Sequence, residues 1–245
     1  MNDFQQTREK MGINFEYFKS LKGELEAEGL SKIEIAGELV YSLRNGLDYL
    51  VKIGGSEANS DITYLSRIGV KRLVCPMIES SFSMEKYMRS TENGGFEQLG
   101  VTIETNVAVE NIESILDAGV SLNEVTIGRT DLSASIGLSN VEEEVITSMV
   151  KKVAIAAKSR GLKVGMGGSV SRLTKETLNN DKELLSLLDF VETRKAIIPI
   201  DIFVNKDALN HAVELEFELL RAREVSLDRT LKQVSGRMKA IKNRL

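Results

Sequence analysis

The sequence contains almost none of the residues that cross-link a secreted protein or anchor a membrane protein. Its one cysteine, Cys75, cannot form a disulfide within the chain, which fits a reducing compartment. The first residues, Met-Asn-Asp-Phe-Gln-Gln, lack the apolar stretch of a signal peptide. No apolar run approaches the roughly 18 residues that a membrane-spanning helix needs. We therefore expect a cytoplasmic protein with no membrane partner.

An excess of positive charge is also missing. The 32 Lys and Arg residues are outnumbered by 36 Asp and Glu residues, which gives a formal net charge of −4. This balance argues against a nucleic acid or an anionic membrane surface as the main partner. What the chain does have is apolar content. Its 245 residues are 42% hydrophobic, enough to bury the core of one large barrel domain or of two small domains.

Short apolar runs rich in β-branched residues alternate with longer amphipathic stretches. Seven runs are predicted to be strands: residues 21–26, 47–53, 72–77, 100–104, 124–127, 162–166 and 190–193. Helical patterns lie between them, for example at 62–68, 107–116 and 141–160. This alternation indicates a parallel α/β sheet. In such folds ligands bind at the carboxyl ends of the strands, and most of the predicted strands in this sequence end in polar residues or glycines.

The expected fold class is α/β, a TIM-type (β/α) barrel formed by residues 1–205. A closed barrel of this type has eight strands, whereas the pattern supplies only seven. The segment ahead of the first predicted strand, residues 4–19, has a helical pattern. We therefore expect the first strand of the barrel to be missing or irregular.

Residues 206–245 are expected to form a C-terminal helical extension. The stretch 206–224 is amphipathic and has few helix breakers. Beyond it, apolar residues recur at alternating spacings of four and three: Leu227, Leu231, Val234, Met238, Ile241 and Leu245. Such a stripe packs on another surface, either the chain's own barrel or a neighbouring subunit. Because the stripe lies beyond the last predicted strand, we expect a homo-oligomer formed through the C-terminal helices.

Two carboxylates stand at the ends of consecutive predicted strands. Glu104 ends the strand 100–104, and Asp131 follows the strand 124–127 after a three-residue turn. If these strands are neighbours, both side chains reach one mouth of the barrel, and two carboxylates with water suit Mg²⁺ or Mn²⁺. The alternative is that Asp131 only caps the helix beginning at Leu132 and that Glu104 is an exposed strand end.

Four sequence blocks resemble, in order and spacing, the HpcH/HpaI aldolase and citrate lyase β-subunit family of phosphoenolpyruvate/pyruvate-domain barrels. They are LVKIGG at 50–55, CPMIES at 75–80, VTIET at 101–105 and IGRTDLSASIG at 127–137. The resemblance implies a modified TIM barrel that makes or breaks carbon–carbon bonds beside a pyruvate or acyl-CoA enolate. It also implies that Glu104 and Asp131 hold the metal. The loop with Thr130 and Asp131 would present backbone N–H groups to the substrate carboxylate.

The chain departs from the family at the cation that faces the substrate. Lys52 stands where the family usually has an arginine, and a lysine supplies charge without the two-pronged geometry of a guanidinium. Arg129, in the turn before Asp131, could supply that geometry instead. The glycines after the strand 47–53 could either form a tight turn or approach a bound ligand. The expected substrate-binding residues are Lys52, Gly54, Arg129, Thr130 and Asp131.

The chain also departs from the family at the general base. Pyruvate aldolases of the family carry a histidine where this sequence has Gly29. Its one histidine, His211, falls in the C-terminal helix and is expected to be a helix-surface or interface residue. The base would then be Glu26, Glu28 or a water on the metal, unless there is none. The expected catalytic residues are therefore Glu26, Glu28 and Arg129.

The sequence thus predicts a metal-dependent carbon–carbon lyase that acts on a small 2-oxo acid or acyl substrate through its enolate. A second interpretation is an enzyme of phosphoenolpyruvate or enolpyruvyl chemistry, with phosphate held by the glycine loop at 167–168. A third is a catalytically reduced barrel that serves as a binding or assembly subunit. The intact carboxylate pair argues against this third interpretation, and the missing histidine argues for it.

Overall fold

The computed structural model describes residues 12–242, with side chains described for residues 12–239. Its centre is a closed barrel whose strands follow one another in sequence order: β1 (Ser20–Glu24), β2 (Asp48–Lys52), β3 (Arg72–Cys75), β4 (Gln98–Ile103), β5 (Glu124–Gly128), β6 (Lys163–Gly167), β7 (Phe190–Glu192) and β8 (Ala196–Pro199). Strands β1 to β7 pair in parallel, so their carboxyl ends meet at one end of the barrel. The predicted TIM-type α/β barrel is confirmed, and the seven predicted strands correspond to β1–β7.

The eighth strand closes the barrel from the C-terminal side. Strand β8 follows β7 through a three-residue turn and runs antiparallel to both β7 and β1. The expectation that the first strand is missing or irregular was wrong: β1 is regular, and the strand that the sequence pattern did not supply is the last one, β8. The predicted helix at 4–19 lies partly outside the described residues, and its described part contains only the 3-10 turn η1 (Phe15–Tyr17). That helix prediction was wrong for residues 12–19.

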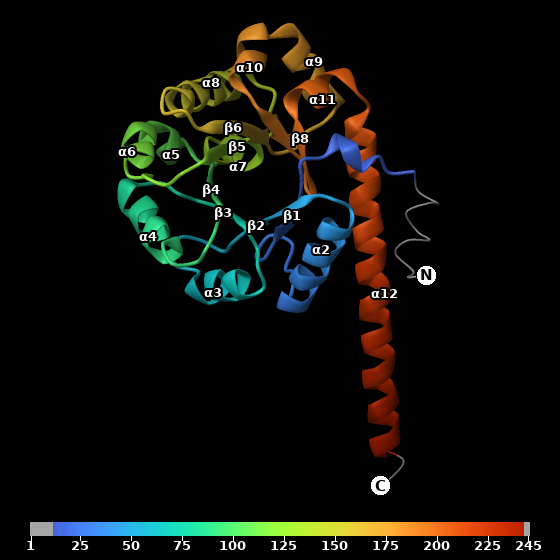
Figure 1. Cartoon of the computed structure of the whole chain (residues 1–245). Helices are drawn as coiled ribbons and strands as arrows, with labels where there is room; N and C mark the ends of the chain where they lie inside the picture. The colour runs from blue at the N-terminus through green and yellow to red at the C-terminus, as the bar shows by residue number, and fades with distance from the viewer. Residues whose placement is uncertain (1–11, 243–245) are drawn as a thin grey trace.

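Helices surround the strands, and the last one leaves the barrel as a long rod (Figure 1). The described α-helices are α2 (Lys32–Arg44), α3 (Asn59–Arg67), α4 (Ser81–Thr91), α5 (Asn106–Glu110), α6 (Ile112–Asp117), α7 (Arg129–Ser135), α8 (Glu144–Lys158), α9 (Arg172–Asn180), α10 (Lys182–Leu187), α11 (Ile200–Asn205) and α12 (Ala208–Lys242). The predicted helices at 62–68 and 141–160 correspond to α3 and α8. The predicted helix at 107–116 is divided at Asn111 into α5 and α6. Among the described residues, no helix combines the length and apolar character needed to cross a membrane.

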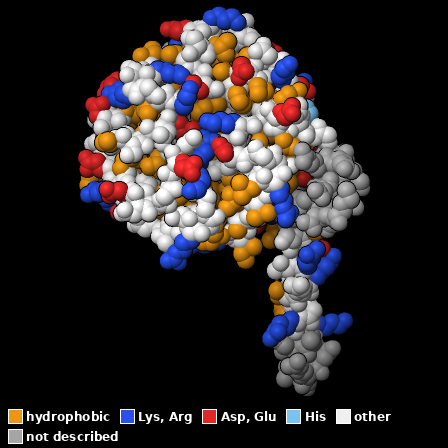
Figure 2. All heavy atoms as spheres, viewed as in Figure 1, with side chains coloured by type: hydrophobic (Ala, Val, Ile, Leu, Met, Phe, Trp, Pro, Cys, Tyr) orange, Lys and Arg blue, Asp and Glu red, His pale blue; other side chains and the backbone are white. Residues whose placement is uncertain are grey.

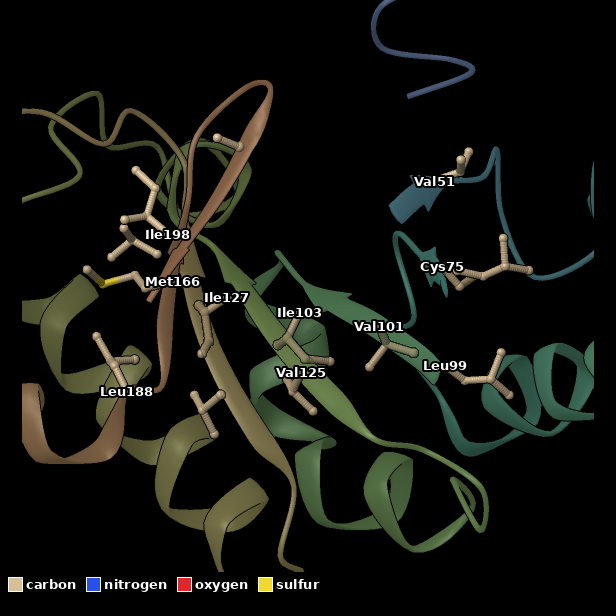
Figure 3. Close-up of a cluster of buried hydrophobic side chains, with 14 of the residues drawn as sticks. Val51, Cys75, Leu99, Val101, Ile103, Val125, Ile127, Met166, Leu188 and Ile198 are labelled. Atoms are coloured by element: carbon tan, nitrogen blue, oxygen red, sulfur yellow. The ribbon is translucent and has the colours of Figure 1, made fainter. Parts of the chain in front are cut away.

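Polar side chains of the strands face the barrel interior while apolar ones face the helices, as β4 illustrates. Val101 and Ile103 belong to the hydrophobic core around the strands (Figure 3). Thr102 and Glu104 line a cavity at the barrel mouth. Because successive side chains of a strand point to opposite faces, polar residues at every second position are delivered to the barrel interior. The same alternation places functional groups inside without interrupting the core.

The amino-terminal end of the barrel is filled by a buried ion pair. Arg72 at the start of β3 donates to both carboxylate oxygens of Glu124 at the start of β5, at 3.0 and 2.9 Å, and to the hydroxyl of Ser20 on β1. Gly100 on the intervening β4 makes room, since a Cβ there would lie 2.9 Å from Cγ of Glu124. The cavity that can admit a ligand therefore lies at the opposite, carboxyl end.

Removing the Arg72 guanidinium should destabilise the barrel. A buried charge left without its partner costs about 3–5 kcal/mol, whereas replacing both partners with apolar groups is often nearly neutral. We expect Arg72→Met to lower the free energy of unfolding by this amount in urea denaturation. The double variant Arg72→Met/Glu124→Met should recover most of the loss. If the double variant loses the sum of the two single losses, the two side chains do not act as a pair.

Candidate active site

A cavity of about 540 Å³ opens at the carboxyl ends of the strands. Its wall combines the inner face of the barrel with the loops after β5, β6 and β7 and with the first turns of α12. A second chamber of about 620 Å³ extends toward the loops after β1, β2 and β3. Both chambers are lined by Glu24, Ala27, Lys52, Glu104 and Asp131. Acidic and basic side chains gather near the centre of the face seen in Figure 2.

The structure brings Glu104 and Asp131 to the same cavity, because β4 and β5 are paired neighbours. Glu104 is buried, and its two oxygens accept from different groups: the backbone N–H of Met77 at 3.0 Å and Lys52 Nζ at 3.3 Å. Burial raises the pKa of the Glu104 carboxyl, and the nearby charge of Asp131 raises it further. Lys52 and the Met77 N–H act in the opposite direction. Glu104 and Asp131 are thus close enough for their negative charges to repel each other. A cation bound by both would reduce this repulsion.

Two strained backbone positions lie beside these acids. Met77, just after β3, and Ser169, just after β6, are the described non-glycine residues with positive φ, at 56° and 51°. Met77 lines the second chamber and Ser169 the first. Side-chain-bearing residues pay for such a conformation with strain, which concentrates at functional sites. At Met77 the conformation accompanies the N–H bond to Glu104.

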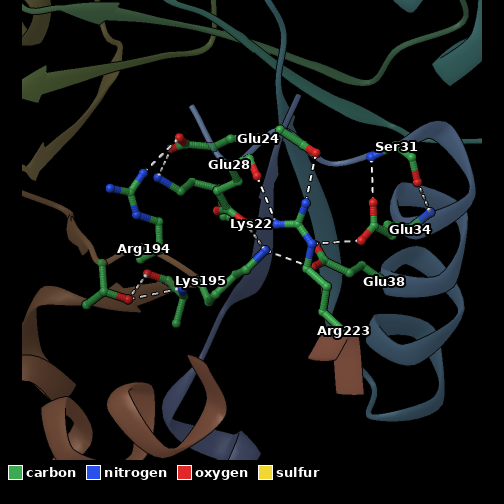
Figure 4. A network of polar contacts seen from close by, with 12 residues as sticks. Lys22, Glu24, Glu28, Ser31, Glu34, Glu38, Arg194, Lys195 and Arg223 are labelled. Atoms are coloured by element: carbon green, nitrogen blue, oxygen red, sulfur yellow. Dashed lines mark hydrogen bonds and ion pairs between the residues drawn. The ribbon is translucent and has the colours of Figure 1, made fainter. Parts of the chain in front are cut away.

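A second charged group, here called the Lys22 cluster, consists of Lys22, Glu24, Glu192 and Arg194. Figure 4 shows Lys22, Glu24 and Arg194 of this cluster. Lys22 Nζ donates to Glu24 at 2.5 Å and to Glu192 at 2.8 Å, and Arg194 donates to the other Glu24 oxygen at 3.1 Å. Burial alone would lower the pKa of Lys22, but the two carboxylates outweigh it and the pKa is raised. Lys22, Glu24 and Glu192 were not predicted as site residues. Lys22 and Glu24 nevertheless stand at every second position of β1, which places both on the same face of that strand.

Arg129 does not line either chamber, contrary to its predicted roles in catalysis and substrate binding. Its guanidinium is buried and pairs with Glu142 at 2.9 Å. It also donates to Thr174 Oγ1 and to the carbonyl oxygens of Gly167 and Gly168. These contacts fix the loop after β6 against the start of α7. Each of the three guanidinium nitrogen atoms of Arg129 thus already donates at least one hydrogen bond within the protein.

The two candidate bases lie in different surroundings. Glu26 is exposed and lines the second chamber next to Gly54, where an added Cβ would come within 2.9 Å of the Glu26 side chain. Glu28 lines neither chamber; it pairs with Lys195, which also donates to Glu38 at 2.7 Å. Burial raises the pKa of Glu28, although the Lys195 charge opposes the shift. Of the two, only Glu26 can meet a ligand in these chambers.

Of the other residues considered in the sequence, Thr130 and Gly54 line a chamber and His211 does not. Thr130 lines the first chamber, where its hydroxyl lies 3.1 Å from that of Ser169. Gly54 lines the second chamber. His211 lines neither; its Nδ1 accepts from the backbone N–H of Asn14 at 3.3 Å and its ring packs on Tyr17. These contacts on α12 are those of a residue that packs the helix against the rest of the protein.

The donor set at the mouth fits one kind of metal. Within the described part of the chain, no group of three or more His, Cys, Asp and Glu residues could form a closed metal cage. Glu104 and Asp131 offer carboxylate oxygens only. A hard divalent ion such as Mg²⁺ or Mn²⁺ is commonly held by one or two carboxylates, with water and substrate oxygens completing its shell. The residues present therefore fit such an ion and do not resemble a structural zinc site.

Replacing Arg129 should cost stability. Burial alone would raise the pKa of Glu142, but its hydrogen bonds and the Arg129 charge outweigh burial and lower it. The pair therefore stabilises the fold above the ordinary glutamate pKa of 4.5, and this contribution is lost as the pH falls through the lowered value. We expect Arg129→Met to lose about 3–5 kcal/mol at pH 7 in urea denaturation, and less below pH 4.5. Full stability combined with lost oxalate affinity would instead make Arg129 a substrate ligand.

Comparison with known proteins supports the resemblance seen in the sequence. Residues 49–176, just over half of the chain, match the family model for HpcH/HpaI aldolase/citrate lyase. No protein with a curated description matches the sequence.

Solved structures share the fold. An HpcH/HpaI aldolase from Desulfitobacterium hafniense DCB-2 has a TM-score of 0.62 at 17% identity, covering 78% of this chain and 80% of that one. An HpcH/HpaI aldolase/citrate lyase family protein from Burkholderia cenocepacia J2315 has a TM-score of 0.62 at 15% identity, covering 86% and 85%. The citrate synthase SbnG has a TM-score of 0.60 at 13% identity, covering 85% of each chain. These identities show a common fold, and the family model shows more: the chain belongs to the HpcH/HpaI aldolase/citrate lyase family.

Proposed function

We propose that this chain is a divalent-metal-dependent carbon–carbon lyase that acts through the enolate of a pyruvate-like 2-oxo acid. The observation that carries the proposal is the meeting of Glu104, Asp131 and Lys52 at the wall shared by two chambers. Membership in a family of aldolases and citrate lyases supports a lyase-type activity. The two chambers offer room for a 2-oxo acid and for a second reactant.

Glu104 and Asp131 would hold Mg²⁺ or Mn²⁺. Such an ion, when bound, acts as a Lewis acid that polarises a carbonyl oxygen and favours the enolate. The protein's part is to fix the acids beforehand. The Met77 N–H and Lys52 hold the two oxygens of Glu104, while α7 presents Asp131 from its first turn. Lys52 would keep a positive charge beside the oxygen on which negative charge develops.

Glu26 would be the general base. It is an acid of the second chamber, and it stands two residues beyond Glu24, which lines both chambers. Glu28 is held by Lys195 and serves the fold. A carboxylate facing a chamber can take a proton from the carbon next to the 2-oxo group. The two acids named together in the sequence prediction would thus have different tasks.

The phosphoenolpyruvate interpretation gains no separate support. Its phosphate site was expected at the glycine loop after β6, where Gly168 lies close to the backbone N atoms of Arg129 and Thr130. The carbonyl oxygens of Gly167 and Gly168 accept hydrogen bonds from Arg129. These contacts fix the loop but do not involve the N–H donors that a phosphate would use, so they favour neither interpretation. The lyase is the better-supported function because the family match supports it.

Exchange of the methyl hydrogens of pyruvate with deuterated water tests this function without knowledge of the second substrate. We expect exchange that depends on Mg²⁺ or Mn²⁺. Asp131→Asn should weaken Mn²⁺ binding about tenfold or more in calorimetry, because one of two anionic ligands is lost, and Glu26→Gln should stop exchange while keeping Mn²⁺ affinity. Asp117→Asn, at a surface ion pair with Arg160, is the matched control. Metal-independent exchange, or none with pyruvate, would contradict the proposal.

We also propose that residues 1–205 form the catalytic barrel and that residues 206–245 mediate homo-oligomerisation. The first half of α12 packs on the barrel through Ala208, Ala212, Leu215 and Leu219, whereas residues 224–239 are exposed throughout. The apolar stripe on that exposed part includes Leu227, Leu231, Val234 and Met238. The side chain of Ile241, and Leu245 altogether, lie outside the described residues.

Burying this stripe against a second copy would contribute about 1.5–3 kcal/mol for each large side chain. We expect Leu231→Glu/Met238→Glu to lower the mass measured by light scattering and to leave the barrel folded. Val120→Glu, an exposed apolar residue away from α12, should leave the mass unchanged. An unchanged assembly in the α12 variant would show that the stripe does not hold the subunits together.

A further inference from the structure

Three cationic side chains line the first chamber: Lys22, Lys52 and Arg194. Lys22 is almost fully buried, with 6% of its side chain exposed, and is held between two carboxylates. Lys52 pairs with Glu104. Neither ammonium group can offer two parallel N–H bonds in one plane. Among the described cations of this chamber, only Arg194 has the geometry to grip a carboxylate with two bonds.

Arg194 also has donors to spare. Its side chain is 49% exposed, and Nη1 donates to Glu24 Oε2 at 3.1 Å (Figure 4). No described residue accepts from its Nε or Nη2, so the edge of the guanidinium formed by these two atoms is open. That edge is suited to a bidentate pair with a carboxylate. Arg194 thus uses one side of its guanidinium to bind Glu24 and keeps the other side for a ligand.

The Lys22 cluster keeps this guanidinium in place. Glu24 accepts from Arg194 with one oxygen and from Lys22 with the other. Lys22 is fixed in turn by Glu192, whose second oxygen accepts from Thr126 at 3.3 Å. Arg194 itself stands in the turn between β7 and β8, so the antiparallel strand that closes the barrel brings it to the mouth. A preorganised arginine loses less freedom when a ligand binds.

We propose that Arg194 binds the carboxylate of the 2-oxo acid, a task that neither Lys52 nor Arg129 can perform with two parallel bonds. The inference rests on the proposed function and adds a substrate-binding residue to it. With a divalent ion on Glu104 and Asp131, the acids of the chamber are balanced by that ion and the three cations, so no unpaired positive charge is left over for an incoming carboxylate. Beside the backbone N–H groups of the loop at Thr130 and Asp131, the open edge of Arg194 offers it further hydrogen-bond donors.

The test compares pyruvate with methyl pyruvate, an ester of similar size that lacks the negative charge. In the deuterium-exchange assay, Arg194→Gln should raise KM for pyruvate about tenfold or more, since hydrogen bonds to a charged group are lost, with little change in kcat. KM for methyl pyruvate should change much less. Arg194→Lys keeps the charge and a partner for Glu24 but loses the two-pronged edge, so its KM for pyruvate should lie between those of wild type and Arg194→Gln.

Binding provides a readout besides activity. Calorimetry with oxalate on Mn²⁺-loaded protein should show weaker binding in Arg194→Gln, with Mn²⁺ affinity and melting temperature close to wild type. Arg160→Gln removes an arginine that lines neither chamber and should change nothing at the site.

Two results would overturn the inference, and they can be told apart from failure of the proposed function. Wild-type exchange with pyruvate, together with unchanged pyruvate KM and oxalate affinity in Arg194→Gln, would place the carboxylate elsewhere. An equal loss for pyruvate and methyl pyruvate would mean that Arg194 only supports the fold. If the wild-type protein neither exchanges pyruvate nor binds oxalate, the proposed function itself fails.

Discussion

Charge burial inside the barrel is the constraint on which the rest of the structure depends. A carboxylate or ammonium removed from water costs several kcal/mol unless an opposite charge and hydrogen bonds replace its hydration. The described interior meets this condition with a series of pairs, from Arg72 with Glu124 at one end to Lys22 with Glu24 and Glu192 near the other. The barrel can therefore have a polar inside without losing its core, because the apolar positions of the same strands face the helices.

The two ends of the barrel use this constraint differently. At the amino end the pair is complete: Glu124 has both oxygens bound by one guanidinium, and nothing is left for a ligand. At the carboxyl end the pairing is incomplete. Glu104 shares its cavity with Asp131 and, among the residues that the structure describes, pairs with the single cation Lys52, while Arg194 keeps one edge open. A divalent cation and an anionic substrate would complete both sets of contacts, which is why we place the chemistry at this end.

Much of this architecture could be predicted from the sequence, and the reasons for the failures are physical. Strands β1–β7 were found because apolar runs bounded by polar residues fix strand positions well. Strand β8 was missed because four residues ending in Pro199 are too short to show a period, and its antiparallel pairing depends on contacts with β1 far away in the chain. Because β8 pairs with the free edge of β1, the barrel closes without a strand ahead of β1.

The candidate site shows the same division. That Glu104 and Asp131 line one cavity could be predicted, because each stands at or just after a strand end and β4 and β5 are neighbours. The direction of the Arg129 side chain could not be predicted, because local position does not tell which way a long side chain turns. Glu142, Thr174 and two loop carbonyls hold it in the interior. Arg194 and Glu24 come from opposite ends of the chain, and only the closed barrel brings them together.

The claim that Glu104 and Asp131 together form a metal site can be tested most directly by crystallography. Crystals grown with Mn²⁺ and oxalate would be measured at a wavelength where manganese scatters anomalously. We expect one strong anomalous peak in the mouth of the barrel, with one oxygen of each acid about 2 Å from it. A manganese ion bound between Glu24 and Glu192, or no ion anywhere in the mouth, would show that Glu104 and Asp131 do not form the metal site.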